Sequence, residues 1–180
     1  MTLAEFMAEV TRDQTASGEV SANRMVLAVD STETGNAASP SAYAIASVHV
    51  EDNGAALSAK TTDKNYLYEG ASTLKTDTQR TFGVTGQRYL GDEFQDFACS
   101  HKIKYGKGTE VQRRYVYFNV DTGEGESGVV TIVTKKDGAA AAGNPTDIEI
   151  DLLGVGTPAE YTYTAPTPGP DPDPDPEEGP

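Results

Sequence analysis

Apolar and polar residues alternate along several short stretches of this 180-residue chain, which is the pattern of β-strands with one buried face. The clearest stretch is 111–120, in which Val116, Phe118 and Val120 share one face. The alternating stretches favour an all-β fold, a β-sandwich or half-barrel of about seven mostly antiparallel strands with one short α-helix. The other predicted strands span residues 24–30, 42–51, 80–85, 129–135, 147–153 and 160–164.

The short helix is predicted directly after the strand 80–85. Asp92 is a favoured N-cap residue, and Gln95 stands three positions later, as in a variant of the capping box. Phe94 and Phe97 then recur at helical spacing on one face. These cap and packing residues give a local structure, and nothing in the stretch is arranged to hold a metal, a phosphate or a nucleophile.

A second helical pattern lies in the N-terminal segment 1–20, where Leu3, Phe6, Met7 and Val10 have amphipathic spacing. Two interpretations stand side by side. The helix packs on its own domain, or it is an arm that contacts a neighbouring subunit.

Two strands carry residues that invite a second interpretation besides a solvated face. On 111–120, Arg113, Tyr115 and Tyr117 have the composition of a protein interface, although a neighbouring strand of the same chain would cover them equally well. On 147–153, Glu149 and Asp151 point away from the apolar face, as candidates for a solvated surface or for the lumen of an assembly.

The segment 55–77 is long, polar and rich in Thr and Lys, with an island formed by Tyr66, Leu67, Tyr68 and Glu69. A segment of this length without a core pattern is typically functional or mobile. The alternative is an ordinary β-hairpin whose tyrosines pack on their own sheet.

The net charge is −14, from 28 acids against 14 bases. Proteins that bind nucleic acid tightly neutralise phosphates with Lys and Arg, so this balance argues against such binding. It fits a conduit through which DNA slides without being held, and it fits plain solubility equally well. No apolar run is long enough to span a bilayer and the N-terminus lacks signal-peptide features, so a cytosol-like compartment and no membrane are expected.

Candidate chemical motifs are weak. The glycines of G-x-G-x-x-G at 123–128 join two strands and include two glutamates, which disfavours a phosphate site. Cys99 and His101 have only one further soft ligand, His49, which is too few for a structural zinc site. The aspartates of the 166–180 tail have the spacing of a calcium loop, but the prolines between them prevent the chain from curling around an ion. No catalytic motif is present, so we expect no enzyme, no cofactor and no metal. The Pro/Asp-rich tail is expected to be disordered.

Three blocks in order resemble the tail tube (major tail) proteins of long-tailed, non-contractile bacteriophages of the siphovirus type. They are KNYLYEG at 64–70, VTGQR at 84–88 and GDEFQDF at 91–97, and the resemblance covers roughly 24–164. It divides the chain into an N-terminal arm (1–20), a tail tube domain (21–165) and the tail (166–180).

The resemblance implies a structural virion protein, assembled in the host cytoplasm, whose hexameric rings close a β-barrel and stack into the conduit for DNA delivery. It places Tyr66, Leu67, Tyr68 and Glu69 in contacts between rings. The implied partners are further copies of the chain, the tape measure protein, the tail terminator and the baseplate or distal tail proteins. Two alternatives remain: a monomeric carbohydrate-binding or adhesion module, and the inner-tube protein of a contractile tail or related secretion device.

Overall fold

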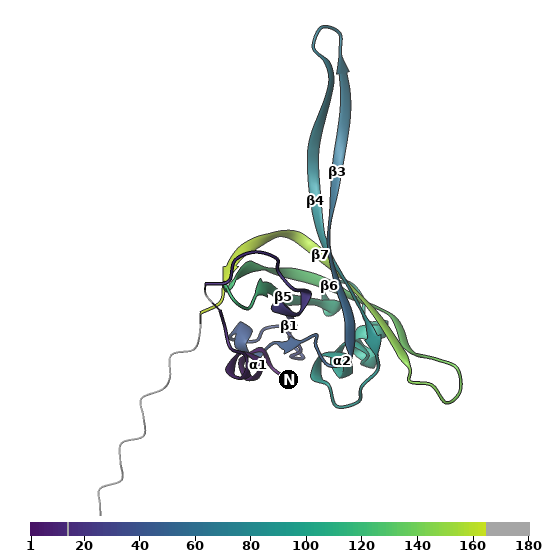
Figure 1. The fold of residues 1–180 in the computed structure, drawn as a ribbon. Helices are drawn as coiled ribbons and strands as arrows, with labels where there is room; N and C mark the ends of the chain where they lie inside the picture. Colours follow the sequence, from purple (N-terminus) through teal and green to yellow (C-terminus); the bar gives the residue numbers. More distant parts are fainter. Residues whose placement is uncertain (14, 165–180) are drawn as a thin grey trace, which may run out of the picture.

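Seven antiparallel strands form one sheet in the order β2-β1-β5-β6-β7-β4-β3 (Figure 1). The computed structural model of the chain describes residues 1–13 and 15–164. The strands are β1 (Met25–Val29), β2 (Ala44–Ile45), β3 (Val50–Tyr66), β4 (Gly70–Gln87), β5 (Gln112–Asn119), β6 (Glu124–Ala139) and β7 (Asp147–Thr162). The helices are α1 (Leu3–Glu9), α2 (Glu93–Ala98) and α3 (His101–Tyr105), with 3-10 turns η1 (Ala22–Arg24), η2 (Pro40–Ala42) and η3 (Gly108–Val111). The predicted fold class is confirmed.

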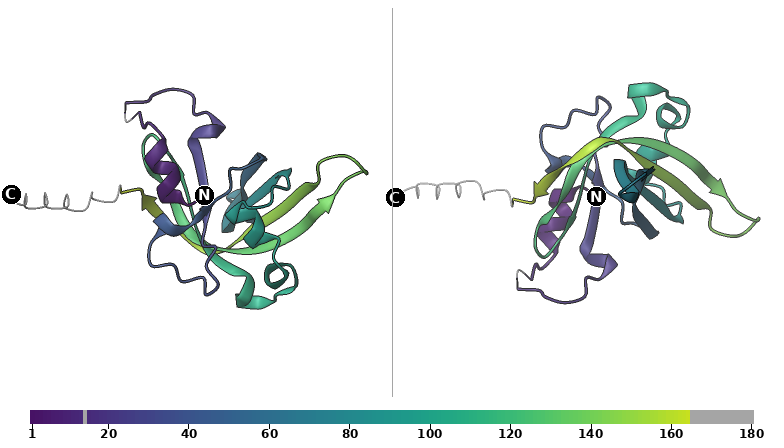
Figure 2. Two further views of the ribbon diagram at one scale, coloured as in Figure 1. Left: turned by 90° about the horizontal axis from the view of Figure 1, so that it is seen from below. Right: turned by 90° about the horizontal axis from the view of Figure 1, so that it is seen from above.

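The connection between β2 and β3 forces the sheet to curve. These strands lie at opposite edges, yet only residues 46–49 join them. A flat seven-stranded sheet would place its edges about 29 Å apart, whereas the chain from residue 45 to residue 50 reaches at most about 18 Å. The sheet therefore arches, as β6 and β7 show from below and above (Figure 2), and it remains open because β2 and β3 do not pair.

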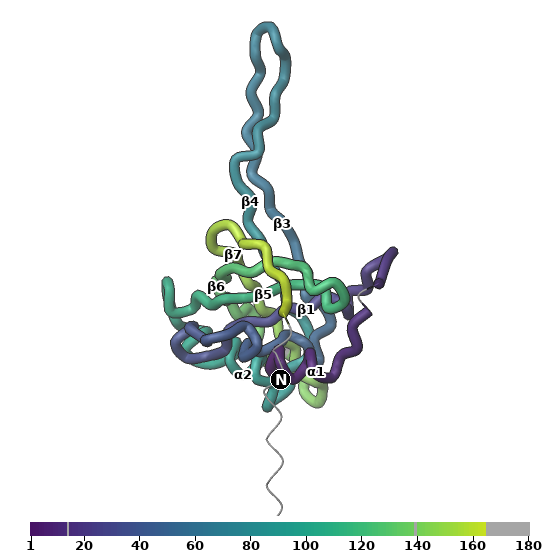
Figure 3. The backbone as a smooth tube through the Cα atoms, turned by 90° about the vertical axis from the view of Figure 1, so that its left-hand side faces the viewer, coloured from purple at the N-terminus to yellow at the C-terminus, as the bar shows by residue number. Residues whose placement is uncertain are grey.

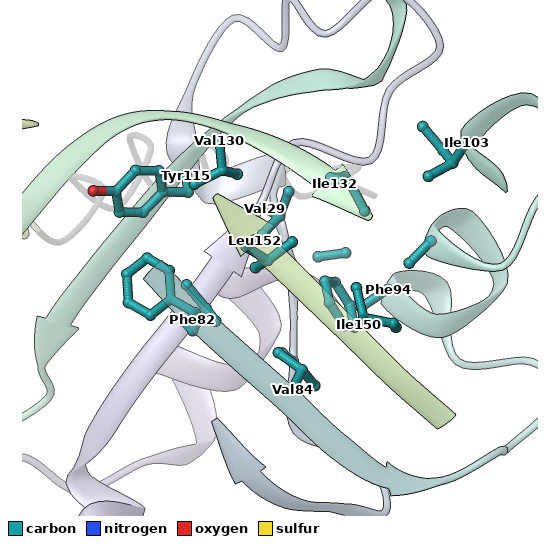
Figure 4. Close-up of a cluster of buried hydrophobic side chains, with 14 of the residues drawn as sticks. Val29, Phe82, Val84, Phe94, Ile103, Tyr115, Val130, Ile132, Ile150 and Leu152 are labelled. Atoms are coloured by element: carbon teal, nitrogen blue, oxygen red, sulfur yellow. The ribbon is translucent and has the colours of Figure 1, made fainter. Parts of the chain in front are cut away.

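One face of the arch packs against α2 and α3. Phe82 and Val84 of β4 and Ile150 of β7 meet Phe94 of α2 in a core whose side chains are almost fully buried (Figure 4). Alternate residues of β4 and β7 supply this core, so the predicted apolar face of 147–153 is confirmed. Burial of this apolar surface holds the helices on the sheet.

A second core lies on the other face of β1 and β5. Leu3 and Met7 of α1 pack there with Val26 and Phe118. The two strands are thus covered on both faces, which explains why β1 reads as a continuous apolar run rather than an alternating one.

The prediction of one strand over 42–51 is wrong. β2 ends at Ile45, a turn with His49 at a φ of 53° follows, and β3 begins at Val50. Gly86 permits the close approach of this turn, because a Cβ on it would lie 2.2 Å from the His49 carbonyl oxygen.

Other predicted elements needed adjustment in length or number. The strands predicted at 147–153 and 160–164 are one strand, β7, and β6 is longer than 129–135 at both ends. The basic connector after α2 contains a further helix, α3, and α1 confirms the helix predicted at the N-terminus. The tail 166–180 lies outside the described residues.

Candidate functional site

The hairpin of β3 and β4 projects from the sheet and stands clear of the rest of the chain in two perpendicular views (Figures 1 and 3). β4 pairs with β7 only over residues 81–87. From Thr81 towards the tip, over residues 70–80 of β4, the two strands of the hairpin pair only with each other among the described residues. The predicted long polar segment is therefore a two-stranded ribbon with both edges free, which is a surface for association.

The ribbon is held by its backbone pairing and by local side-chain contacts rather than by a core. Its threonines favour extended backbone, and Thr73 donates a hydrogen bond to Asp63 across the strands at 2.7 Å. Leu57 and Leu74 remain largely exposed. An isolated two-stranded hairpin is marginally stable in water, so this ribbon gains from any partner that covers it.

The tip of the hairpin carries the four residues that the resemblance places in contacts between rings. Gly70, at a φ of 80°, closes the turn, and Leu67 and Tyr68 are 87% and 94% exposed. Tyr66 is 43% exposed, and Glu69 is exposed as well. The alternative in which both tyrosines pack on their own sheet does not hold. An apolar tip at the end of a projecting ribbon has the form of an anchor for another protein surface.

The base of the hairpin is fixed by Arg80. Its Nε lies 2.6 Å from Oε1 of Glu126 on β6, although the N–H does not point along this line, so the contact is mainly electrostatic. The guanidinium also stacks over Phe82 and Tyr117, 4.8 and 4.9 Å from the ring centroids. Tyr115 donates a hydrogen bond to Glu126 at 3.1 Å, and burial raises the pKa of Tyr115, which keeps this donor protonated.

Gln95 ties the two strands of the hairpin to helix α2. Asp92 caps the helix as predicted, accepting a hydrogen bond from the Gln95 backbone at 3.0 Å. The buried Gln95 side chain does not complete a capping box. It donates instead to the carbonyls of Val48 and Gln87, at 2.7 and 3.2 Å, and accepts from the Tyr89 backbone at 2.7 Å. The chain entering β3 and the chain leaving β4 are thereby held together.

The N-terminal segment packs on its own chain, in agreement with the first of its two interpretations. Thr2 and Glu5 form a reciprocal capping box at the start of α1. Leu3 and Met7 are buried in the second core and offer no surface to a neighbour, whereas Phe6 and Val10 are half-buried and keep an exposed part.

A charged contact holds the segment after α1 in place. Arg24 binds the carboxylate of Asp121 through two nitrogens, and the backbone N–H of Asp13 donates to the same carboxylate at 2.9 Å. The hydrogen bonds from Arg24 and from the Asp13 backbone lower the pKa of Asp121 to about 2. The N-terminal segment is thus fastened to the turn between β5 and β6.

The expected interface residues of β5 are mostly internal, so the hypothesis of an interface on this face needs correcting. Arg113 is 3% exposed and donates to the carbonyls of Glu110 and Gln112, and burial lowers its pKa. Tyr115 is 1% exposed, and Tyr117 is half-buried. The alternative explanation applies, because neighbouring elements of the same chain cover this face.

The two candidate lumen acids lie on the outward face of β7, but their charges are compensated. Lys135 on β6 lies 2.6 Å from Asp151 and 3.5 Å from Glu149, and Lys136 lies 2.8 Å from Glu149. The ion pair with Lys136 and, to a smaller extent, the one with Lys135 lower the pKa of Glu149. This patch is a network of two acids and two lysines with no net charge, rather than an acidic wall.

Within residues 1–13 and 15–164, no cluster of three or more His, Cys, Asp or Glu side chains is placed to hold a metal ion. The Cys99 thiol is half-buried, and burial raises its pKa. No helix in the described part of the chain is long and apolar enough to cross a membrane.

Comparison with solved structures finds the same fold in chains of gene transfer agent particles. A chain from the tail of an empty gene transfer agent particle with C6 symmetry matches 81% of this chain and all of its own length, with a TM-score of 0.57 and 15% identity. A chain from the virion of a native gene transfer agent particle matches 80% of this chain and all of its own length, with a TM-score of 0.56 and 12% identity. No protein-family model and no curated protein matches the sequence.

Proposed function

We propose that this chain is the tail tube subunit of a long-tailed phage or phage-like particle. Copies form hexameric rings, the rings stack through their hairpins, and the resulting tube conducts DNA into the host. The single observation that carries the proposal is the projecting hairpin with Tyr66, Leu67 and Tyr68 exposed at its tip. A monomer gains nothing from such a ribbon, whereas stacked rings bury it.

The comparisons support the same function. One similar chain comes from the tail of an empty gene transfer agent particle and the other from the virion of a native one. The tail has C6 symmetry, which is the basis for proposing six subunits in a ring. Ring closure would also cover the outer edge of β3, a long unpaired edge that risks uncontrolled association in a free subunit.

Further parts of the proposal follow from the place of such a subunit in a tail. The tube would surround the tape measure protein and end at the tail terminator and at the baseplate or distal tail proteins. Assembly would take place in the host cytoplasm. The net charge of −14 favours passage of DNA over its capture. The function is structural and uses neither catalysis nor a cofactor.

The experiment is the double variant Tyr66→Ala/Tyr68→Ala. Because both side chains are exposed, the variant should keep the melting temperature of the parent, but it should form no stacked tubes by electron microscopy and sedimentation velocity. The matched control is Leu90→Ala/Tyr105→Ala, which removes two side chains that are 80% and 68% exposed outside the hairpin. Normal tubes from the hairpin variant would overturn the role of the tip.

A further inference from the structure

A cleft of about 210 Å³ opens at the start of β3, between α1, β1 and the first residues of the strand. Apolar and polar atoms share its walls about equally, and the apolar side chains of Phe6, Met25 and Val50 are half-buried beside it. Glu51 and Asp52 stand exposed at its rim. The cleft therefore combines several apolar side chains with an acidic border.

The cleft and the hairpin tip lie at opposite ends of the same strand. The cleft surrounds the first residues of β3. Tyr66 is the last residue of this strand and lies about 53 Å away, at 3.3 Å per residue. Figure 1 shows α1 on the side of the sheet away from the tip. An extended ribbon cannot fold back over this distance, so the tip of one molecule cannot fill its own cleft.

We propose that the cleft receives the hairpin tip of a second copy of this chain. The inference rests on the proposed tube function and adds to it the site on which the tip docks. A patch that fits a pocket elsewhere on an identical molecule makes a head-to-tail contact, which propagates as a filament unless the rotation between copies closes it into a ring. Leu67 and Tyr68 are the anchors, because they are the most exposed large apolar side chains at the tip.

Charge favours the same pairing. In residues 57–77, Lys60, Lys64 and Lys75 balance Asp63, Glu69 and Asp77, so the ribbon is neutral and the rest of the chain carries the whole charge of −14. A neutral ribbon approaches an acidic body without the repulsion that two acidic bodies exert on each other. At the tip, Lys64 lies three residues before the anchor Leu67 and would meet the rim carboxylates of Glu51 and Asp52, whereas Glu69, which follows the anchor Tyr68, would have to stay outside the cleft.

A second groove, at the base of the hairpin, fits the tip less well. It measures about 450 Å³ and is bordered by Lys75, Asp77, Arg80 and Glu126. Burying Leu67 or Tyr68 there would desolvate the ion pair of Arg80 and Glu126 and the exposed charges of Lys75 and Asp77, which is unfavourable. This groove is the natural comparison site for the experiment.

The test uses disulfide trapping between separately purified proteins in a Cys99→Ser background. One protein carries Glu69→Cys at the tip, next to the anchor Tyr68, and the other carries Asn53→Cys at the cleft. The comparison partner carries Pro158→Cys at the second groove. The proteins are mixed under assembly conditions and oxidised, and each carries one cysteine, so a tip-to-cleft bond appears as a mixed covalent dimer. A disulfide needs Cα atoms roughly 4.4–6.8 Å apart, which makes the readout local.

The tip protein should form mixed dimers with the Asn53→Cys protein and not with the Pro158→Cys protein. If tubes assemble but the tip is trapped only at Pro158→Cys, the docking site is overturned while the tube function stands. If neither tubes nor mixed dimers form, both proposals fail. The microscopy of the same samples separates these two results.

A second variant tests the cleft without cysteines. Met25→Lys places an ammonium in the cleft, where it would pair with the rim carboxylates in place of Lys64 and lose its hydration under the tip, so it should raise the critical concentration for assembly about tenfold. Leu90→Lys is the matched control on an exposed site of the body and should leave that concentration unchanged. Circular dichroism confirms that both variants are folded, and unchanged assembly of a folded Met25→Lys variant would overturn the docking site.

Discussion

Arg80 of β4 lies with its Nε 2.6 Å from Oε1 of Glu126 on β6, although β7 runs between these two strands. Gly154 of β7 makes the contact possible, since a Cβ at this position would lie 2.6 Å from the Arg80 carbonyl oxygen. The ion pair connects the base of the projecting hairpin to the centre of the sheet. It therefore sets the direction in which the ribbon leaves the body, and that direction decides where the tip arrives on another subunit.

The first prediction concerns this base. Arg80→Met keeps an aliphatic chain over Phe82 and Tyr117 but removes the charge that faces Glu126. We expect the free energy of unfolding to fall by about 1–3 kcal/mol, because a partly buried carboxylate loses its cation. Chemical denaturation measures this change.

Lys60→Met is the matched control for Arg80→Met. Lys60 lies 3.9 Å from Asp77 in the exposed part of the hairpin, with side-chain exposures of 73% and 62%. Exposed ion pairs contribute little, so the change should stay below about 0.5 kcal/mol. Equal losses for the two variants would contradict the anchoring role of Arg80.

The second prediction concerns the clamp at Gln95. Gln95→Leu leaves three backbone groups without their partner, namely the carbonyls of Val48 and Gln87 and the N–H of Tyr89. We expect a loss of about 3 kcal/mol or more in the free energy of unfolding, because unsatisfied buried polar groups are costly. Gln79→Leu removes one exposed hydrogen bond, to Gly154, and should change stability by less than about 0.5 kcal/mol. A tolerated Gln95→Leu would show that the turn at His49 holds without the clamp.

The third prediction is a pH dependence. The folded protein lowers the pKa of Asp121 from 3.8 to about 2, so protonation of this carboxyl favours the unfolded chain. Its contribution to stability is present above pH 3.8 and is lost as the pH falls through about 2. Asp121→Asn should melt at a lower temperature than the parent near neutral pH, and the difference should shrink between about pH 4 and pH 2. A difference that stays constant over this range would assign the stabilisation to another group.

The fourth prediction is the axial repeat of the assembled tube. If the tip of one copy sits in the cleft of the next, the distance between successive copies cannot exceed the length of β3, about 53 Å for residues 50–66. A tilted hairpin gives a shorter repeat. Helical averaging of tube images measures this value, and a longer repeat would exclude the tip-to-cleft contact.

The sequence predicts those parts of the fold that depend on local patterns. The alternation in 111–120 and 147–153 predicts β5 and the start of β7, and Asp92 predicts the first turn of α2. The resemblance also singles out Tyr66 to Glu69, which lie exposed at the hairpin tip, and their contacts between rings stay a prediction. Local patterns suffice where neighbours in the sequence determine the outcome.

Long-range contacts explain what the sequence does not reveal. Nothing near Gln95 indicates that its amide binds Val48, 47 residues earlier, and Arg80 meets Glu126 across an intervening strand. The break after Ile45 was missed because both faces of 42–51 are apolar, which is typical of a buried strand, whereas the chain must there cross between the two edges of the arch. Arg113 resembles an interface residue in composition and is buried under its own chain. Composition alone does not distinguish these environments.

Electron microscopy of the purified protein at rising concentration, with sedimentation velocity on the same samples, tests the central claim most directly. The account predicts rings and stacked hollow tubes, with an axial repeat no longer than about 53 Å. A chain that stays monomeric throughout the concentration range, with neither rings nor tubes in the images, would contradict the tube function and favour a monomeric binding module.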